Sequence, residues 1–566
     1  MGVRTCAVLL AALLTAGCGG SVEPARPADP PRVVAPPDRG EPRPVRQAPD
    51  PDVVLVVMDD VPAWLVDTMP EVRRMVRAGA SYEQAFVPDS LCCVSRASLL
   101  TGQYPHQTGV RTNTANTPNP VGPVGGWEAF EAYGNLERSV NVALQEAGWT
   151  TGFVGKYLNQ YEYVPGGEVP PVPPGWTSWQ PVFGSAYDGW DFDVMSASSG
   201  DALPLVEHVD APPEWATDEE KDAAYAGKVI ADRAVDFVRD HEDDRTPWFL
   251  TVAPYAAHSR VGPVGHYPGD PGFPPAFRDR PAPGRPGNCG LVDCRDLSVD
   301  DLPGWGDDQA DNAPVAADGG TAYQWRPDST PNATYGTSVV RSQAQMVQSI
   351  DRMLRRLREA AGPDTWFVLM SDNGIHVGQH GLGVGKGTAF DTDIRVPLVV
   401  TGPSVRAGTR TSVVSTLDIA PTLEDLAGLR SPRYRSGTSL LPDLVGRRPD
   451  RRQFAFVEHT WASTLGVDPD ASYAGGTMDD IPSYVAVRSR DGLLVRYDLD
   501  PSVEGVDPAL ELYDYRRVGW ERRNVAADPA ARGLLGRLSR RLALFDACAG
   551  VTGDEPVPPS CRSLSR

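Results

Sequence analysis

Residues Asp52–Met58 read DVVLVVM, and two aspartates, Asp59 and Asp60, follow directly. A continuous apolar run rich in valine predicts a strand that is buried on both faces, as the strands of parallel sheets are. Four more runs rich in β-branched or aromatic residues occur at Thr150–Gly155, Pro247–Ala253, Thr365–Met370 and Val396–Gly402. We predict that all five runs are parallel strands.

Helical patterns lie between these runs, at Met69–Ala80, Asp218–His241, Ser338–Ala361 and Ile419–Ala427. Strands that alternate with helices are typical of an α/β fold, in which helices cover both faces of a sheet. We therefore predict an α/β protein whose mostly parallel sheet is sandwiched by helices.

The pattern changes near Asp450, where shorter strands such as YVAVRS and LLVRYD precede a helical segment, Ala530–Leu544. This change predicts a main domain at 51–445 and a small C-terminal α+β domain with an antiparallel sheet at 446–566. Two long stretches, Tyr161–Asp201 and Arg260–Pro331, are rich in Gly, Pro and Asp, and we expect surface loops around the mouth of a site.

The composition indicates a soluble globular protein that is long enough for more than one domain. Of its 566 residues, 41% are hydrophobic and 22% are charged, and the formal net charge is −21. This acidity argues against nucleic acid as a partner and favours the binding of cations.

The first 18 residues resemble an export signal, with Arg4 as the charged end and Ala7–Leu14 as the apolar core. The apolar core is too short to span a bilayer. Cys18 ends a small-residue region, so either lipidation of Cys18 or simple cleavage fits, and the protein would be a bacterial surface lipoprotein or secreted. Residues 19–50 are rich in proline, a composition that favours an extended tether.

Cysteine spacing agrees with an oxidising compartment. The short separations predict the disulfides Cys289–Cys294 and Cys548–Cys561. These pairs would leave Cys92 and Cys93 outside the disulfides. Thiols outside disulfides are unusual in an exported protein, so we expect a specific role for at least one of them.

Polar residues follow four of the predicted strands, where α/β sheets usually place their sites. They are Asp59 and Asp60, then Lys156, then His258, and finally Asp372 and Asn373. The three carboxylates and the amide carbonyl are hard oxygen ligands, which suit Ca²⁺ or Mg²⁺ better than zinc. The alternative is that the DD and SDNG segments are only turns or helix caps.

Four cationic or titratable side chains could hold an oxyanion such as sulfate or phosphate: Arg96, Lys156, His258 and Lys386. Lys386 alone could equally be a solvated loop lysine. If a helix begins at Ser95–Leu100, Cys92 lies just before its N-terminus, where free amides favour an anion. Cys92 and Cys93 could instead be small buried residues.

The segment Cys92–Gly102, CCVSRASLLTG, resembles the signature of the type I sulfatases of the alkaline phosphatase superfamily. The likeness continues through TGQYPHQTGV, FVGKYLNQY, PPGW, SDNGIHVGQHGL, GKGTAFDTDIRVPLVVTGPSVRAG and STLDIAPTLEDLAGL, and covers most of residues 51–445. The motifs are most similar to the branch that contains N-acetylglucosamine-6-sulfatases and the extracellular heparan 6-O-endosulfatases. The resemblance implies the alkaline-phosphatase-like fold.

The resemblance also implies roles for individual residues. Cys92 would be oxidised to formylglycine by a formylglycine-generating enzyme, and its hydrated aldehyde would supply the nucleophile. One Ca²⁺ would be held by Asp59, Asp60, Asp372, Asn373 and residue 92. His258 would protonate the leaving alcohol, Lys156 and Lys386 would neutralise sulfate oxygens, and Arg96 would orient residue 92. The implied substrate is a sulfated sugar, with N-acetylglucosamine 6-sulfate as the favourite.

Three positions depart from the family pattern. Val94 stands where the signature has proline or alanine, a position that the formylglycine-generating enzyme reads. Leu158 replaces the histidine that serves the elimination step in many arylsulfatases, so the elimination base is unassigned, with His376 and His106 as candidates. His380 lies where the branch tends to have an aromatic residue. The candidate substrate contacts are His376, His380, Asn159 and His106.

Two other functions remain open on the sequence. A phosphomonoesterase or phosphodiesterase on the same fold would use a similar metal and similar cations. A non-catalytic lipoprotein that binds sulfated sugars would keep Cys92 as a thiol, and Val94 is the feature that favours it.

Overall fold

A computed structural model describes the protein over residues 51–114, 123–198, 203–307, 310–316, 322, 330–461, 481–498, 508–517 and 519–566. The predicted export signal, Cys18 and the proline-rich stretch lie outside the described residues. Among the described residues, no helix combines the length and the apolar character needed to cross a membrane.

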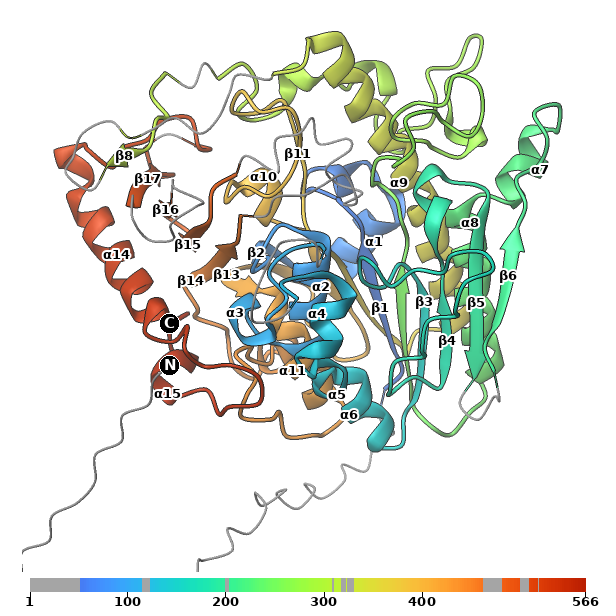
Figure 1. Ribbon diagram of the computed structural model, residues 1–566, viewed down its shortest axis with the longest axis horizontal. Coiled ribbons are helices and arrows are strands. Elements are labelled where there is room, and N and C mark those ends of the chain that lie inside the picture. The colour runs from blue at the N-terminus through green and yellow to red at the C-terminus, as the bar shows by residue number, and fades with distance from the viewer. Residues whose placement is uncertain are drawn as a thin grey trace, which may run out of the picture. The chain divides into compact units, whose positions relative to one another are not determined.

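Within the described part of the chain, ten strands form one large mixed sheet (Figure 1). Their order is β13 (Gly408–Ser415), β2 (Ala80–Phe86), β12 (Leu398–Thr401), β9 (Trp366–Ser371), β1 (Val53–Met58), β7 (Trp248–Ala253), β3 (Thr150–Gly155), β4 (Ser178–Pro181), β5 (Phe192–Ser198) and β6 (Leu205–Val209). The central strands from β9 to β4 are parallel, whereas β12, β5 and β6 run antiparallel to their neighbours on the central side.

Strand β1 is buried along its whole length because helices cover both faces of the sheet. Val54 and Val56 pack in one core, and Val53 and Leu55 pack in the other, as the alternation of side chains along a strand requires. The first core includes α1 (Pro70–Ala78), α8 (Ala226–His241) and α9 (Ala333–Ala361). The second core includes α2 (Cys92–Thr101), α4 (Gly126–Ala132), α6 (Val140–Glu146), α11 (Ile419–Leu426) and α12 (Leu441–Leu444).

A smaller sheet of five antiparallel strands lies beside α14 (Arg532–Asp546) (Figure 1). Its strands, in order, are β14 (Phe454–His459), β15 (Tyr484–Ser489), β16 (Gly492–Asp498), β17 (Pro508–Asp514) and β8 (Val315–Ala316). One face of this sheet packs on α14, and the other packs against Phe390 and Ile394, so the sheet is fixed to the site-bearing part of the chain. The predicted domain boundary at 445/446 stays a prediction.

The remaining elements are short. They are α3 (Pro105–Thr108), α5 (Asn135–Arg138), α7 (Asp218–Ala223), α10 (Asp391–Ile394), α15 (Pro559–Arg562) and a two-stranded hairpin of β10 (His376–Val377) and β11 (Val384–Gly385). Two disulfides, Cys289–Cys294 and Cys548–Cys561, confirm the predicted pairs.

Four sequence predictions about elements were wrong in detail. The strand predicted at Val396–Gly402 is present as β12, but it is antiparallel to β9. The helix predicted at Asp218–His241 breaks into α7 and α8 around Ala224 and Tyr225. The predicted loop Tyr161–Asp201 contains β4 and β5, which extend the large sheet. The fourth concerns Cys92, which is the first residue of α2 and does not precede the helix.

Candidate active site

The carboxyl ends of four adjacent parallel strands build the site, as the sequence predicts. Strand β1 is followed by Asp59 and Asp60, and β9 is followed by Asp372 and Asn373. Lys156 directly follows β3, and His258 lies five residues beyond the end of β7. Because these strands are neighbours in the order β9-β1-β7-β3, their ends deliver the polar side chains to one place.

Two further segments complete the site from outside the central strands. Helix α2 places Cys92 in its first turn, and the β10–β11 hairpin is followed at once by Lys386. The Nζ of Lys386 lies 2.7 Å from the Sγ of Cys92 and donates to Asp60 Oδ1 at 2.5 Å. The start of a helix of ten residues also favours an anionic group at Cys92 through its exposed amides and its dipole.

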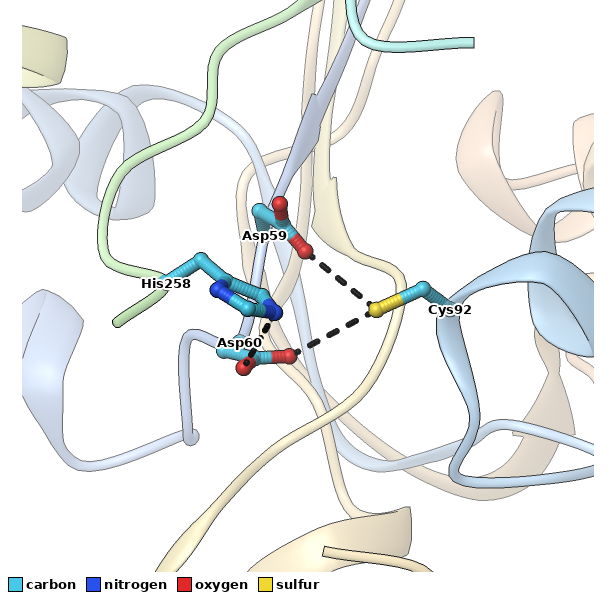
Figure 2. Close-up of side chains that lie close together, drawn as sticks. All are labelled: Asp59, Asp60, Cys92 and His258. Atoms are coloured by element: carbon cyan, nitrogen blue, oxygen red, sulfur yellow. Dashed lines mark hydrogen bonds and ion pairs between the residues drawn. The ribbon is translucent and has the colours of Figure 1, made fainter. Parts of the chain in front are cut away.

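Cys92 faces the two aspartates directly. Its Sγ is 3.5 Å from Asp59 Oδ1 and 3.8 Å from Asp60 Oδ1. Figure 2 shows Cys92 and His258 approaching the aspartates from opposite sides. One ligand atom from each of these four residues lies within 4.8 Å of the others. Cys93, by contrast, packs in the core beneath the helix, and its backbone N–H donates to Asn113.

Each carboxylate of the site has its own cation. Lys156 Nζ donates to Asp59 Oδ2 at 2.7 Å, and Arg96 Nε donates to Asp372 Oδ2 at 2.7 Å. Lys386 is the partner of Asp60. All the residues predicted for the metal and the chemistry are buried here, with no more than 4% of each residue's surface exposed. In such a water-poor environment, electrostatic interactions are stronger than they are in solvent.

Two cations of the site, Lys156 and Arg96, keep their charge despite this burial. Burial alone would lower the pKa of Lys156, but the Asp59 carboxylate and Cys92 outweigh it and hold the pKa well above its ordinary value. Burial also opposes the charge of Arg96, yet Asp372 and Asp59 raise its pKa above that of a free guanidinium. Both side chains therefore remain positive wherever the protein is folded near neutral pH.

His258 has one ring nitrogen committed to the backbone. Its Nδ1 lies 2.6 Å from the carbonyl oxygen of Ser259, and because a carbonyl only accepts, Nδ1 carries a hydrogen. The Nε2 atom lies 3.6 Å from Asp60 Oδ2 and so faces the site. The doubly protonated ring can therefore present an acidic N–H at Nε2, next to the carboxylate that stabilises its charge.

The oxygen donors fit a hard divalent cation. Asn373 Nδ2 donates to Asp60 Oδ1 at 2.6 Å, whereas the buried Oδ1 of Asn373 has no hydrogen-bond partner among the described residues. A buried carbonyl oxygen without a partner is costly, and a cation between it and the aspartates would satisfy it. The carboxylates of Asp59, Asp60 and Asp372 supply the remaining charge.

The candidate substrate contacts are spread over several places. The Nδ1 of His106 lies 2.6 Å from Glu458, beside a cavity that α3 shares with the small sheet. His376 is buried with Nδ1 at 3.0 Å from Asp393, and its Nε2 has no partner in the described part of the chain. His380 is buried between Asp307 and Glu521. Asn159 is also buried, and its side-chain amide makes no hydrogen bond to the described residues. Their roles stay predictions.

Sequence reasoning missed two tyrosines at the site. The Tyr187 ring lies 4.6 Å from the His258 ring, and Lys156 Nζ is 4.9 Å from the Tyr187 centroid. Tyr255 packs edge-on against Tyr187. Burial, more than any neighbour, raises the pKa of Tyr187 well above its ordinary value, so this hydroxyl stays neutral. No spacing signal marked Tyr187, because it lies in the stretch that was expected to be a loop.

Comparison with known proteins gives matches to both sequence and fold. The family model described as Sulfatase matches residues 51–429. The N-acetylglucosamine-6-sulfatase of Homo sapiens is 27% identical over 539 residues, which cover 89% of this chain and 86% of that protein. The extracellular sulfatase SULF-1 homolog of Drosophila melanogaster is 28% identical over 411 residues, which cover 70% of this chain. That match spans only 31% of the Drosophila protein.

A solved structure shares the fold at low sequence identity. It is a complex of a protein with its substrate D-glucosamine-2-N,6-O-disulfate, and it matches with a TM-score of 0.59 and 18% identity. The match covers 88% of this chain and 98% of that one. The predicted alkaline-phosphatase-like architecture, with its second, smaller antiparallel sheet, is therefore confirmed.

Proposed function

The chain belongs to the sulfatase family and hydrolyses sulfate esters, and from this premise we propose that it acts on a sulfated sugar through a formylglycine formed from Cys92. The observation that carries the proposal is the position of Cys92. Its Sγ lies within 3.8 Å of both aspartates and 2.7 Å from a buried lysine ammonium. A residue used only for packing would not need three charged neighbours.

We propose that one calcium ion is held by the carboxylates of Asp59, Asp60 and Asp372 and by the side-chain amide oxygen, Oδ1, of Asn373. The donors are all oxygens, which calcium prefers, and the Asn373 oxygen has no other partner among described residues. The ion would supply positive charge beside the sulfate group. The His258 nitrogen and the residue 92 side chain face the same space.

The chain's own residues then divide the chemistry. As a hydrated aldehyde, residue 92 would offer the hydroxyl that attacks sulfur. Lys386, already in contact with that side chain, favours negative charge on the attacking oxygen, and Lys156 supplies a second fixed positive charge across the site. Arg96 holds Asp372 and thereby keeps the ligand cluster in place.

His258 is the proposed acid for the leaving alcohol. As the sulfur–oxygen bond breaks, the alcohol oxygen gains negative charge, and a proton delivered from Nε2 removes it. The Nδ1 bond to Ser259 fixes the ring in the orientation that points Nε2 into the site. A sugar hydroxyl is a poor leaving group, so this proton matters most for sugar sulfates.

We propose N-acetylglucosamine 6-sulfate as the substrate. The support is that the human relative is an N-acetylglucosamine-6-sulfatase and that the solved neighbour contains a 6-O-sulfated glucosamine as its substrate. We also propose that the protein is exported, because the Drosophila relative is named extracellular and two disulfides are present among described residues.

The test is to produce the full chain with and without a formylglycine-generating enzyme, then measure the mass of the tryptic peptide containing residue 92. Release of sulfate from 4-nitrophenyl sulfate and from N-acetylglucosamine 6-sulfate should appear only when that peptide has lost its thiol. Cys92→Ala should abolish release, while Cys93→Ala, the matched neighbour, should retain it. Full activity with an intact thiol at residue 92 would overturn the formylglycine proposal.

A further inference from the structure

The cavity beside His106 has a volume of about 440 Å³ and lies between the turn before α2, α3 and the small sheet. Its volume is within the range of roughly 300–1,000 Å³ that is common for small-molecule pockets. The residues that matter here are Asp89, His106, Glu458, His459, Tyr484 and Arg496. We call this cavity the ring pocket.

Two buried side chains in the ring pocket have polar atoms that are not fully satisfied. His459 is only 5% exposed, and its ring contacts the backbone of Ile481, but neither ring nitrogen has a hydrogen-bond partner of normal geometry among the described residues. Asp89 Oδ1 accepts from the N–H of Leu91 at 2.7 Å, but its buried Oδ2 has no such partner in the described chain. Oδ2 lies 3.9 Å from His459 Nδ1, which is too far for a hydrogen bond. These atoms are placed to bind a polar ligand.

Two other charged groups that line the ring pocket, Glu458 and Arg496, are already paired. Glu458 accepts from the backbone N–H of His106 at 3.0 Å and lies 2.6 Å from its Nδ1. Arg496 makes two hydrogen bonds to Asp546, at 2.7 and 2.8 Å. Burial lowers the pKa of His459 to about 4 and raises that of Asp89 well above its ordinary value, so burial favours the uncharged form of both. His459 and Asp89 therefore suit hydrogen bonds to uncharged groups of a ligand.

The ring pocket adjoins the catalytic residues through two short pieces of chain. Asp89 lies three residues before Cys92, and the Tyr484 hydroxyl donates to the carbonyl of Gly387 at 3.0 Å. Gly387 directly follows Lys386 and lies so close to the pocket wall that an added Cβ would sit 3.8 Å from His459 Cε1. The segments that carry Cys92 and Lys386 thus also contribute to, or contact, the wall of the ring pocket.

We propose that the ring pocket binds an uncharged, hydroxyl-bearing sugar ring of the substrate, and that His459 and Asp89 form hydrogen bonds to its hydroxyl groups. His459 is then a specificity-determining residue for sugar sulfates over sulfates of other alcohols. The inference rests on the proposed function, and it adds the place and the chemical character of the group that carries the sulfate.

The test compares two esters on the enzyme made with the formylglycine-generating enzyme. His459→Ala should raise KM for N-acetylglucosamine 6-sulfate by about tenfold or more, because a lost hydrogen bond in a buried site is worth roughly 1–3 kcal/mol. On 4-nitrophenyl sulfate, which has no sugar, the same variant should lose much less kcat/KM. The fold-loss there should be at least ten times smaller than the fold-loss on N-acetylglucosamine 6-sulfate. His459→Gln keeps a donor and an acceptor and should recover part of the affinity. His208→Ala, an exposed histidine on β6, is the matched control.

Asp89→Asn tests whether the pocket prefers an uncharged ring. The amide keeps the acceptor for Leu91, so the turn before α2 should survive. The ratio of kcat/KM for N-acetylglucosamine 6-sulfate to that for glucosamine 6-sulfate should stay within about twofold of wild type. A loss confined to the free amine would mean that Asp89 binds a cation, which would overturn the inference.

The failures of the two proposals are distinguishable. If the wild-type protein with an oxidised residue 92 hydrolyses neither ester, the proposed function fails. If it hydrolyses both, and His459→Ala changes neither or lowers both equally, the ring-pocket inference alone is wrong. Thermal unfolding of each variant separates a binding defect from a folding defect, and His459→Gln provides the second variant if alanine unfolds the protein.

Discussion

The ammonium of Lys386 lies 2.7 Å from the sulfur of Cys92 and at the same time donates to Asp60 Oδ1 at 2.5 Å. One cation thus joins the proposed nucleophile to a proposed metal ligand. Lys386 reaches this position from a loop after the short β11 strand, and the loop packs against the small sheet through Gly387. The nucleophile therefore depends on contacts from both sheets.

Replacing Lys386 with alanine should lower kcat on sulfate esters by about 10²–10³-fold, the usual cost of removing one group that stabilises the charge developed in the transition state. Lys228→Ala is the matched control, because Lys228 is half-exposed on α8 and pairs only with Asp232 among the described ion pairs. Steady-state rates on 4-nitrophenyl sulfate measure the effect. Equal rates for the two variants would contradict the role of Lys386.

Val94→Ala should increase the fraction of chains in which residue 92 is oxidised, because alanine restores a residue that the signature resemblance expects at this position. Val94 is buried in the second core, so the substitution also costs stability of roughly 1–3 kcal/mol. Peptide mass measures the oxidised fraction, and thermal unfolding measures the cost. An unchanged oxidised fraction would show that the formylglycine-generating enzyme accepts valine at position 94 as well as it accepts alanine.

Calcium should raise the melting temperature of the protein, and a chelator should reverse the shift. Binding stabilises a folded protein by about 3 kcal/mol when the free ligand is at 100 times its Kd. Asn373→Ala removes the carbonyl oxygen that has no partner among described residues, and it should weaken the calcium-dependent shift. This readout does not depend on activity.

Asn332→Ala is the control for calcium. Asn332 caps α9 by accepting from the N–H of Tyr335, so its loss should lower stability by about 1 kcal/mol with and without calcium. The proposed ligand set is wrong if calcium raises the melting temperature of Asn373→Ala as much as that of the wild type. It is also wrong if zinc raises the melting temperature of the wild type more than calcium does.

His258→Ala should lower kcat on a sugar sulfate by about 10²–10⁴-fold, the usual contribution of a general acid. The loss on 4-nitrophenyl sulfate should be much smaller, because nitrophenolate leaves without needing a proton. The comparison of the two esters therefore separates an acid from a residue that only shapes the site. Equal losses on both esters would contradict the acid role.

The buried His459 predicts a dependence of stability on pH. Burial lowers its pKa from 6.5 to about 4. Between these values the unfolded chain binds a proton at this ring and the folded chain does not, so this side chain makes stability fall as pH drops from 6.5 to 4. His459→Gln should reduce that fall by about 3 kcal/mol, measured by urea unfolding at both pH values. Parallel curves for wild type and variant would refute it.

The central strands could be predicted because burial on both faces leaves a plain sequence signature. The runs that became β1, β7 and β9 are mainly apolar, and the run that became β3 is rich in β-branched residues. The polar residues that follow these four strands lie together in the structure. The direction of β12 could not be predicted, because an apolar run carries no information about which way the chain passes through the sheet.

The start of α2 was also beyond local signals. Leu91 is the N-cap and makes no side-chain cap, and Cys92, Cys93 and Val94 have weak helix preference, so the pattern favoured a start at Ser95. The packing of Cys93 and Val94 in the second core instead favours a helix that already begins at Cys92. The contact between Tyr187 and His258 joins segments about 70 residues apart. The local pattern of apolar and polar residues cannot predict a contact over such a separation.

The complete burial of Cys92 has a consequence for how the molecule matures. Any enzyme that oxidises this thiol must take the side chain into its own catalytic cleft, and a folded α2 with its core behind it does not release one. If residue 92 is oxidised as we propose, the oxidation would have to occur on the extended nascent chain, before the fold closes. The fraction of active molecules would then depend on the rate of oxidation relative to the rate of folding, and a molecule that folded first would stay inactive.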